Sequence, residues 1–130
     1  MTRTGTCCCC GDAKVTVRDD PVLNGVCHCN DCKRRTGAAF GWNAYFPEAR
    51  VLERAGDWMT YEPVAQPGQC RYACKRCGTL MWWVAPFMPE AIGVPGGLFL
   101  APPLPEPDST YQHGDHLAWV SVPDGWNRMS

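Results

Sequence analysis

The alternation of apolar and polar residues along the chain predicts a succession of short β-strands. Residues 13–18 are the clearest case, because Ala13, Val15 and Val17 alternate with polar residues, as in a strand with one buried face. The other segments with strand character are residues 22–26, 38–46, 51–53, 58–61, 70–73, 79–84 and 116–122. Because these segments are short and separated by turn-forming residues, the predicted fold class is mostly β with little helix.

Two other stretches limit the architecture. Asn30 or Asp31 can cap a single helical turn that runs through Arg35 and ends at Gly37. Residues 86–108 hold seven prolines and three glycines, which excludes a long helix and most central strands. We therefore expect an extended connection there, forming a wall or lid of a site, and a loose tail over residues 123–130. The length favours one domain over residues 1–130.

Charge and hydropathy exclude two classes of partner. The chain has 12 Lys and Arg against 13 Asp and Glu, a net charge of -1, so no broad basic surface is available for nucleic acid. No apolar run approaches the ~18 residues of a membrane span, and the first residues lack the apolar segment of a secretory signal. These features predict a cytoplasmic protein with no membrane association.

Ten cysteines require an explanation, which is either disulfides or metal. Without a secretory signal the thiols are expected to stay reduced, and they occur in tight clusters. Close pairs such as Cys-X-X-Cys converge readily on one ion, whereas a disulfide between such near neighbours is strained. Metal binding is therefore the better hypothesis.

The first and last clusters together predict a closed zinc site. Cys8 and Cys10 form one ligand pair, and Cys74 and Cys77 form the other, each followed by a glycine. Alternate side chains of an extended segment share a face, which favours Cys8 with Cys10. The pair Cys7 and Cys9 is the alternative. Four thiolates around one ion are typical of a structural zinc.

The middle cluster predicts a second, open zinc site. Cys27, Cys29 and Cys32 supply three ligands, and His28 is expected to point to the opposite face. Zinc with three thiolates would carry a formal charge of -1 (2 − 3), which makes it a poor activator of water. Such an ion stays soft enough to bind one more sulfur and to deprotonate an incoming thiol. We predict that a thiol substrate takes the fourth position.

Basic residues follow this cluster directly. Arg34 and Arg35 are the expected substrate-binding residues, since guanidinium groups grip carboxylates with paired hydrogen bonds. Two alternatives stay open. The arginines can form a solvated face, and the three cysteines can form a second structural site completed by Cys70, Cys7 or a histidine.

These motifs, in order, resemble the glutathione-dependent formaldehyde-activating enzyme (GFA) family, which also includes the centromere protein V type. The resemblance rests on Cys8-X-Cys10-Gly11, Cys27-His28-Cys29-X-X-Cys32-X-Arg34-X-Thr36-Gly37 and Cys74-X-X-Cys77-Gly78. It implies a zinc-containing β-tent domain of antiparallel strands, a structural zinc on Cys8, Cys10, Cys74 and Cys77, and a catalytic zinc on Cys27, Cys29 and Cys32. It also implies a carbon–sulfur lyase that joins formaldehyde to glutathione as S-hydroxymethylglutathione.

The predicted function is therefore a zinc-dependent carbon–sulfur lyase with two zinc ions. It would bind a small thiol such as glutathione as a zinc thiolate, and form or break an adduct with an aldehyde. The alternative is a non-catalytic, zinc-stabilised interaction module, which requires a basic face or extension that this chain lacks. A zinc deaminase is excluded because the chain has no His-X-Glu and no Pro-Cys-X-X-Cys.

Overall fold

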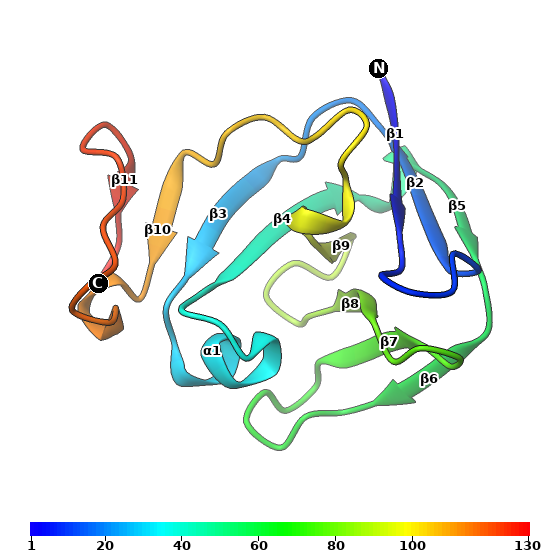
Figure 1. Ribbon diagram of the computed structural model, residues 1–130, viewed down its shortest axis with the longest axis horizontal. Helices are drawn as coiled ribbons and strands as arrows, with labels where there is room; N and C mark the ends of the chain where they lie inside the picture. Colours follow the sequence, from blue (N-terminus) through cyan, green and yellow to red (C-terminus); the bar gives the residue numbers. More distant parts are fainter.

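The computed structural model describes all 130 residues and is built almost entirely of strands (Figure 1). In chain order the strands are β1 (Thr2–Thr6), β2 (Lys14–Arg18), β3 (Leu23–Cys27), β4 (Gly41–Pro47), β5 (Val51–Ala55), β6 (Trp58–Tyr61), β7 (Cys70–Cys74), β8 (Leu80–Val84), β9 (Ala91–Pro95), β10 (Ser109–Tyr111) and β11 (Asn127–Arg128). The one α-helix is α1 (Asn30–Thr36), and three 3-10 turns are η1 (Glu48–Arg50), η2 (Gly96–Leu98) and η3 (His113–Asp115). The predicted mostly β class is confirmed.

The strands form two sheets. The smaller sheet has the order β1-β2-β5, and the larger has the order β11-β10-β3-β4-β9-β8-β7-β6. Figure 1 shows β1 and β2 at one side of the molecule, β10 and β11 at the other, and α1 between the ends of β3 and β4. Most pairs are antiparallel as expected, but β10 runs parallel to both β3 and β11.

A single apolar core joins the two sheets. In β2 the side chains of Val15 and Val17 are fully buried, whereas Lys14 and Arg18 are exposed. These valines belong to one cluster with Phe46 of β4 and residues of β8 and β9. Removal of this apolar surface from water is the main force that holds the small sheet against the large one.

The prediction that residues 86–108 form an extended connection, with most central strands excluded, is wrong for β9. This strand lies between β4 and β8 in the middle of the large sheet, and its residues 91–94 are buried. Proline is absent from its interior and stands only at its end, at Pro95, so the ladder keeps its donors. Gly93 gives room to an indole, since a Cβ there would lie 2.2 Å from Trp83.

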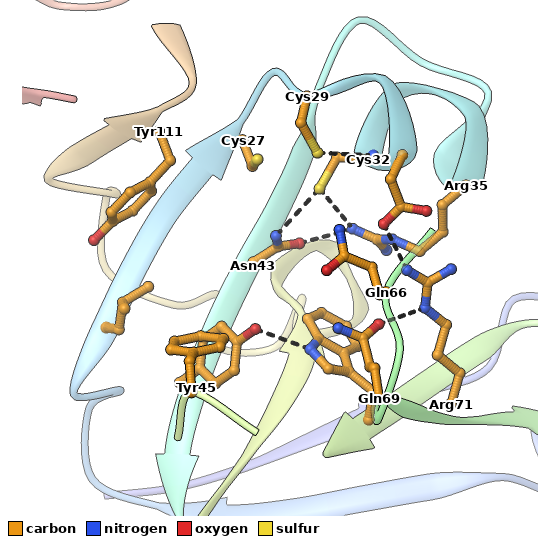
Figure 2. Close-up of a pocket in the computed structure, with 14 residues that line it drawn as sticks. Cys27, Cys29, Cys32, Arg35, Asn43, Tyr45, Gln66, Gln69, Arg71 and Tyr111 are labelled. Carbon is orange, nitrogen blue, oxygen red and sulfur yellow. Dashed lines mark hydrogen bonds and ion pairs between the residues drawn. The ribbon is translucent and has the colours of Figure 1, made fainter. Parts of the chain in front are cut away.

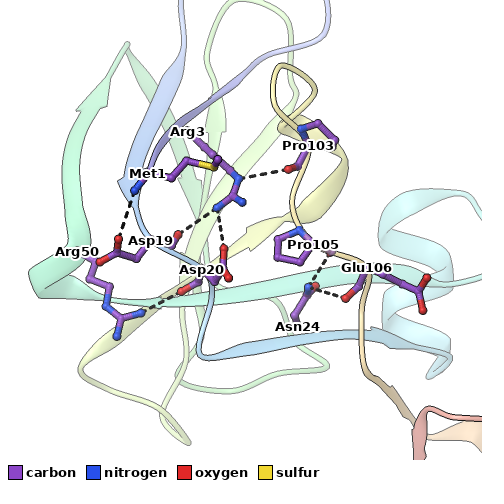
Figure 3. A network of polar contacts seen from close by, with 9 residues as sticks. All are labelled: Met1, Arg3, Asp19, Asp20, Asn24, Arg50, Pro103, Pro105 and Glu106. Atoms are coloured by element: carbon purple, nitrogen blue, oxygen red, sulfur yellow. Dashed lines mark hydrogen bonds and ion pairs between the residues drawn. The ribbon is translucent and has the colours of Figure 1, made fainter.

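The rest of the proline-rich stretch is anchored to one strand of each sheet (Figure 3). Arg3, which is 7% exposed, donates to the carbonyl oxygen of Pro103 (3.2 Å) and to the carboxylate of Asp20 (3.1 Å). Asn24 donates to the carbonyl oxygen of Pro105 (2.9 Å). These contacts hold the segment along β1 and β3 as a strap.

The two ends of the chain also differ from the prediction. Residues 116–122 contain turns but no strand, and Trp119 is 77% exposed. Strand β10 precedes them, and the tail expected to be loose contributes β11 beside it. Strand β1 consists of threonine, arginine and glycine, so it lacks the alternation of apolar and polar residues that predicts a strand.

Helix α1 is longer than the single turn expected, and Cys29 caps it. The Cys29 sulfur accepts a hydrogen bond from the Cys32 backbone N–H, the role expected of Asn30 or Asp31. Gly37 ends the helix in the left-handed conformation (φ 65°), as predicted. None of the helices has the length and hydrophobicity that crossing a membrane requires.

Candidate functional site

Four cysteines from two distant turns converge on one point. The ligand sulfurs of Cys7, Cys10, Cys74 and Cys77 all lie within 4.8 Å of one another. Cys7 follows β1, and Cys74 ends β7, so the group connects the small sheet to the large one. The structure thus brings together three of the four residues predicted for the closed site.

The fourth residue is Cys7, not Cys8. Residues 8–11 bend sharply, so the rule that alternate residues share a face does not apply to them. The exposed Cys8 sulfur instead lies 2.9 Å from the sulfur of Cys9 and 3.0 Å from the hydroxyl of Thr79. Neither Cys8 nor Cys9 belongs to a group of converging ligands.

The two turns have the same sequence pattern and the same backbone conformation. Each has the spacing Cys-X-X-Cys-Gly, and the glycine of each has a positive φ, 73° at Gly11 and 80° at Gly78. The left-handed conformation lets the chain turn back directly after the second cysteine. Equal spacing in both pairs was the signal that favours Cys7 over Cys8.

The second group consists of Cys27, Cys29 and Cys32, whose sulfurs also lie within 4.8 Å of one another. Cys27 ends β3, Cys29 caps α1, and Cys32 lies in the first turn of that helix. The group contains no fourth cysteine, histidine or carboxylate. Cys70 lies outside both groups.

His28 points away from this group, as expected. Its side chain is fully buried, and its Nε2 lies 2.9 Å from the Thr110 hydroxyl. The Thr110 hydroxyl also lies 3.0 Å from Nδ1 of His113, and His116 stacks on His113 with ring centroids 4.6 Å apart. Burial lowers the pKa of His28 and favours the neutral ring.

Cys32 has two polar neighbours that favour its thiolate. Arg35 donates to the Cys32 sulfur at 3.7 Å and Asn43 donates to it at 3.6 Å, while Arg35 also donates to the Asn43 side-chain oxygen at 2.9 Å. A hydrogen bond from Cys27 and the charge of Arg35 lower the pKa of Cys32 to about 5. The same bond with Cys32, together with burial, raises the pKa of Cys27.

Both groups have the donor chemistry of zinc sites. Sulfurs bound at ~2.3 Å to one tetrahedral ion lie about 3.8 Å apart. The sulfur of Cys10 lies 3.4 Å from that of Cys7 and 3.6 Å from that of Cys74, close to this spacing. Soft thiolates in sets of four or three favour zinc over hard cations such as magnesium or calcium. Four sulfurs would complete the shell of a tetrahedral zinc, whereas three would leave one position for a ligand from outside the chain.

The three-cysteine group opens into a pocket of about 220 Å³. Figure 2 shows the sulfurs at one end, Tyr45 and Gln69 toward the other, and Tyr111 and Arg71 on opposite sides. The pocket is lined by Leu23, Cys27, Cys29, Asp31, Cys32, Arg35, Asn43, Tyr45, Gln66, Gln69, Arg71, Trp83, Phe87 and Tyr111.

Of the two arginines predicted to bind substrate, only one lies in the pocket. Arg35 lines the pocket, with its guanidinium 5.0 Å from the centre of the Trp83 ring. Arg34 is exposed and does not line the pocket. On a helix, adjacent residues point in different directions, so only one of the two can face the sulfurs.

Arg71 is a pocket residue that the sequence did not indicate. It is 4% exposed and donates to the Asp31 carboxylate and to the Gln69 side-chain oxygen, each at 2.6 Å. The ion pair ties the start of α1 to β7, across 40 positions of sequence. No local sequence pattern indicates an ion pair between residues so far apart. Asn43, Tyr45 and Gln66 also line the pocket without any local pattern that indicates it.

Comparison with known proteins agrees with this architecture. The family model described as "Glutathione-dependent formaldehyde-activating enzyme" matches residues 2–113. The crystal structure of a Rhodobacter sphaeroides protein, a structural genomics target, matches with a TM-score of 0.55 and 21% identity, covering 98% of this chain and 99% of that one. That likeness shows the fold alone, and no curated protein matches the sequence. The family match spans most of the chain, which therefore belongs to the glutathione-dependent formaldehyde-activating enzyme family.

Proposed function

We propose that the protein is a zinc-dependent carbon–sulfur lyase that forms or breaks the adduct between a small thiol, such as glutathione, and an aldehyde. The observation that carries this proposal is the position of the three-cysteine group at one end of the pocket. Three sulfurs would leave a tetrahedral ion one free position, and the pocket that these cysteines line is a space that a small molecule can enter.

Cys27, Cys29 and Cys32 would hold this zinc, and a zinc there would supply a thiophilic position that lowers the pKa of an incoming thiol. Arg35 and Asn43 support the group by donating hydrogen bonds to the Cys32 sulfur. Hydrogen bonds to a ligand atom fix its orientation and offset the negative charge of the cluster.

The reaction needs a proton donor for the aldehyde oxygen. The thiol sulfur adds to the carbonyl carbon, the carbonyl electron pair moves to oxygen, and that oxygen takes up the proton lost by the thiol. Tyr45 lines the same pocket toward the end away from the sulfurs, and its O–H remains available to a ligand there because its oxygen accepts from Trp83 Nε1 (2.9 Å). Burial raises the pKa of Tyr45 to about 12, so the hydroxyl stays protonated at neutral pH.

Cys7, Cys10, Cys74 and Cys77 would hold a second zinc with a structural role. Thr79 contributes to this site by a hydrogen bond with the Cys77 sulfur (3.2 Å), which is the largest cause of the lowering of the Cys77 pKa to about 5. Four sulfurs close the coordination shell, so this ion would have no part in the reaction.

The test combines metal analysis with exchange NMR. We expect two zinc ions per chain, and faster exchange between free formaldehyde and its glutathione adduct when the protein is present. Addition of glutathione should change the X-ray absorption edge spectrum of one zinc only. Cys29→Ser should abolish the acceleration and keep the fold, judged by circular dichroism.

Cys9→Ser is the matched control, since Cys9 is exposed and lies outside both sulfur groups. We expect this variant to accelerate exchange as the parent protein does. Retention of full activity in Cys29→Ser, or an edge spectrum unaffected by any thiol, would refute the proposal.

A further inference from the structure

The pocket has one apolar wall, formed by the exposed ring of Phe87 and by the small exposed parts of Tyr45 and Trp83. Tyr45 and Trp83 meet at right angles with ring centroids 5.8 Å apart, and Phe87 lies 5.2 Å from Tyr45. The hydrogen bond from Trp83 to the Tyr45 oxygen fixes two of the three rings. Because these rings support one another, the wall exists before a ligand arrives, and its ordering costs no binding energy.

The charged groups of the pocket are already engaged within the protein. Arg71 is paired with Asp31 at 2.6 Å, so these two charges cancel. Arg35 donates to Asn43 and to the Cys32 sulfur, which makes it the counter-charge of the sulfur group. The pocket therefore offers little net attraction to the carboxylates of a ligand, and its remaining polar groups are neutral amides and tyrosine hydroxyls.

The pocket has the size of a small ring compound. Its volume is about 220 Å³, and with ~30 Å³ for each water-sized group it holds about seven non-hydrogen atoms. Formaldehyde would leave most of this space and the entire apolar wall without contact. A complete glutathione adduct would exceed it, so the peptide part would extend outward.

We propose that the aldehyde that this site handles carries a planar apolar group, as an aromatic aldehyde does, and that this group packs against Tyr45, Trp83 and Phe87. The inference rests on the proposed function. The step stays balanced: the thiol sulfur bonds to the aldehyde carbon, and the oxygen receives the thiol proton, so the product is an S-(hydroxyarylmethyl) adduct. Aromatic contacts of this kind favour edge-to-face or offset arrangements of the rings.

The test uses two stable analogues of the competing adducts. S-benzylglutathione represents the aromatic adduct and S-methylglutathione represents the formaldehyde adduct, and isothermal titration calorimetry with the zinc-loaded protein measures both affinities. We expect S-benzylglutathione to bind about tenfold more tightly, as expected for one buried aromatic group in contact with others. Phe87→Ala should reduce this preference to about threefold.

Phe87 suits this substitution because its side chain is 64% exposed, so its loss leaves the core intact. Trp119→Ala is the matched control, since Trp119 is 77% exposed and does not line the pocket. This variant should keep the full preference for the benzyl group. Equal affinity of the two analogues, or an equal loss of preference in both variants, would overturn the inference.

The result is separable from that of the proposed function. Accelerated exchange of the formaldehyde adduct without any preference for the benzyl analogue refutes the inference alone. Absence of exchange with every aldehyde, together with absence of binding by either analogue, refutes both.

Discussion

Arg35 connects the sulfur group to the rest of the pocket through one side chain. Its guanidinium donates to Cys32 and to Asn43 and lies over the face of Trp83. A guanidinium suits this position because it can donate in several directions within one plane while its face stacks on an aromatic ring. The charge of the sulfur cluster is therefore balanced from within the protein.

The first prediction concerns this residue. Arg35→Gln should lower the affinity for one of the two zinc ions by roughly 10- to 100-fold, the usual effect of losing a hydrogen-bond partner of a metal ligand. Chelator competition, monitored with a zinc indicator, measures the affinity of each ion. Arg34→Gln removes the same charge from the exposed neighbour and should change neither affinity. Equal loss in the two variants would mean that Arg35 acts only through long-range charge.

The sequence was informative where ligands lie close together in the chain and uninformative where they do not. Cys27, Cys29 and Cys32 could be grouped by spacing alone, because one turn and the start of a helix position all three. The pair Arg71 and Asp31 could not, since only the completed sheet places β7 beside α1. The prediction names Cys8 where the structure has Cys7 because it treats residues 7–10, which bend, as an extended segment.

At the scale of secondary structure, β9 decides whether the pocket has an inner wall. This strand connects β4, which carries Tyr45, to β8, which carries Trp83. Its sequence is short and flanked by proline, so composition suggested a loop. It is a central strand because its side chains are buried on both faces of the sheet. The composition of the whole 86–108 stretch does not reveal this. Close packing against Trp83 requires glycine at position 93.

The second prediction follows from this close approach. Gly93→Ala should destabilise the fold by about 1–3 kcal/mol or more, because the added methyl group would overlap the Trp83 indole and force a shift of the pocket wall. Thermal unfolding followed by circular dichroism measures the loss. Gly97→Ala is the control, since nothing lies within 4 Å of a Cβ there. Similar unfolding midpoints for the two variants would show that the wall can move without cost.

For the whole molecule, a zinc ion on the four-cysteine group would supply stability that a larger domain obtains from its core. The small sheet contacts the large one through one apolar cluster, which includes Cys7 and Cys74 and has Cys10 and Cys77 packed against it. An ion bound to these four sulfurs would therefore join the two sheets within that cluster. Free energies of metal binding on the order of 10 kcal/mol in small zinc domains are comparable to the total stability of a typical domain. We therefore expect the structural ion to determine whether the two sheets stay together.

The third prediction separates the two candidate ligands of that ion. Cys7→Ser should release one zinc and lower the unfolding midpoint by on the order of 10 °C or more, because the ion would lose one of four thiolates and part of its binding energy. Cys8→Ser should retain both zinc ions and change stability by no more than about 0.5 kcal/mol, since the Cys8 side chain is exposed and outside the group. Zinc content by mass spectrometry and unfolding by calorimetry provide the two measurements. If Cys8→Ser were the variant that lost zinc, the ligand pair would be Cys8 with Cys10, and the turn after β1 would have to straighten to bring these two sulfurs onto one face.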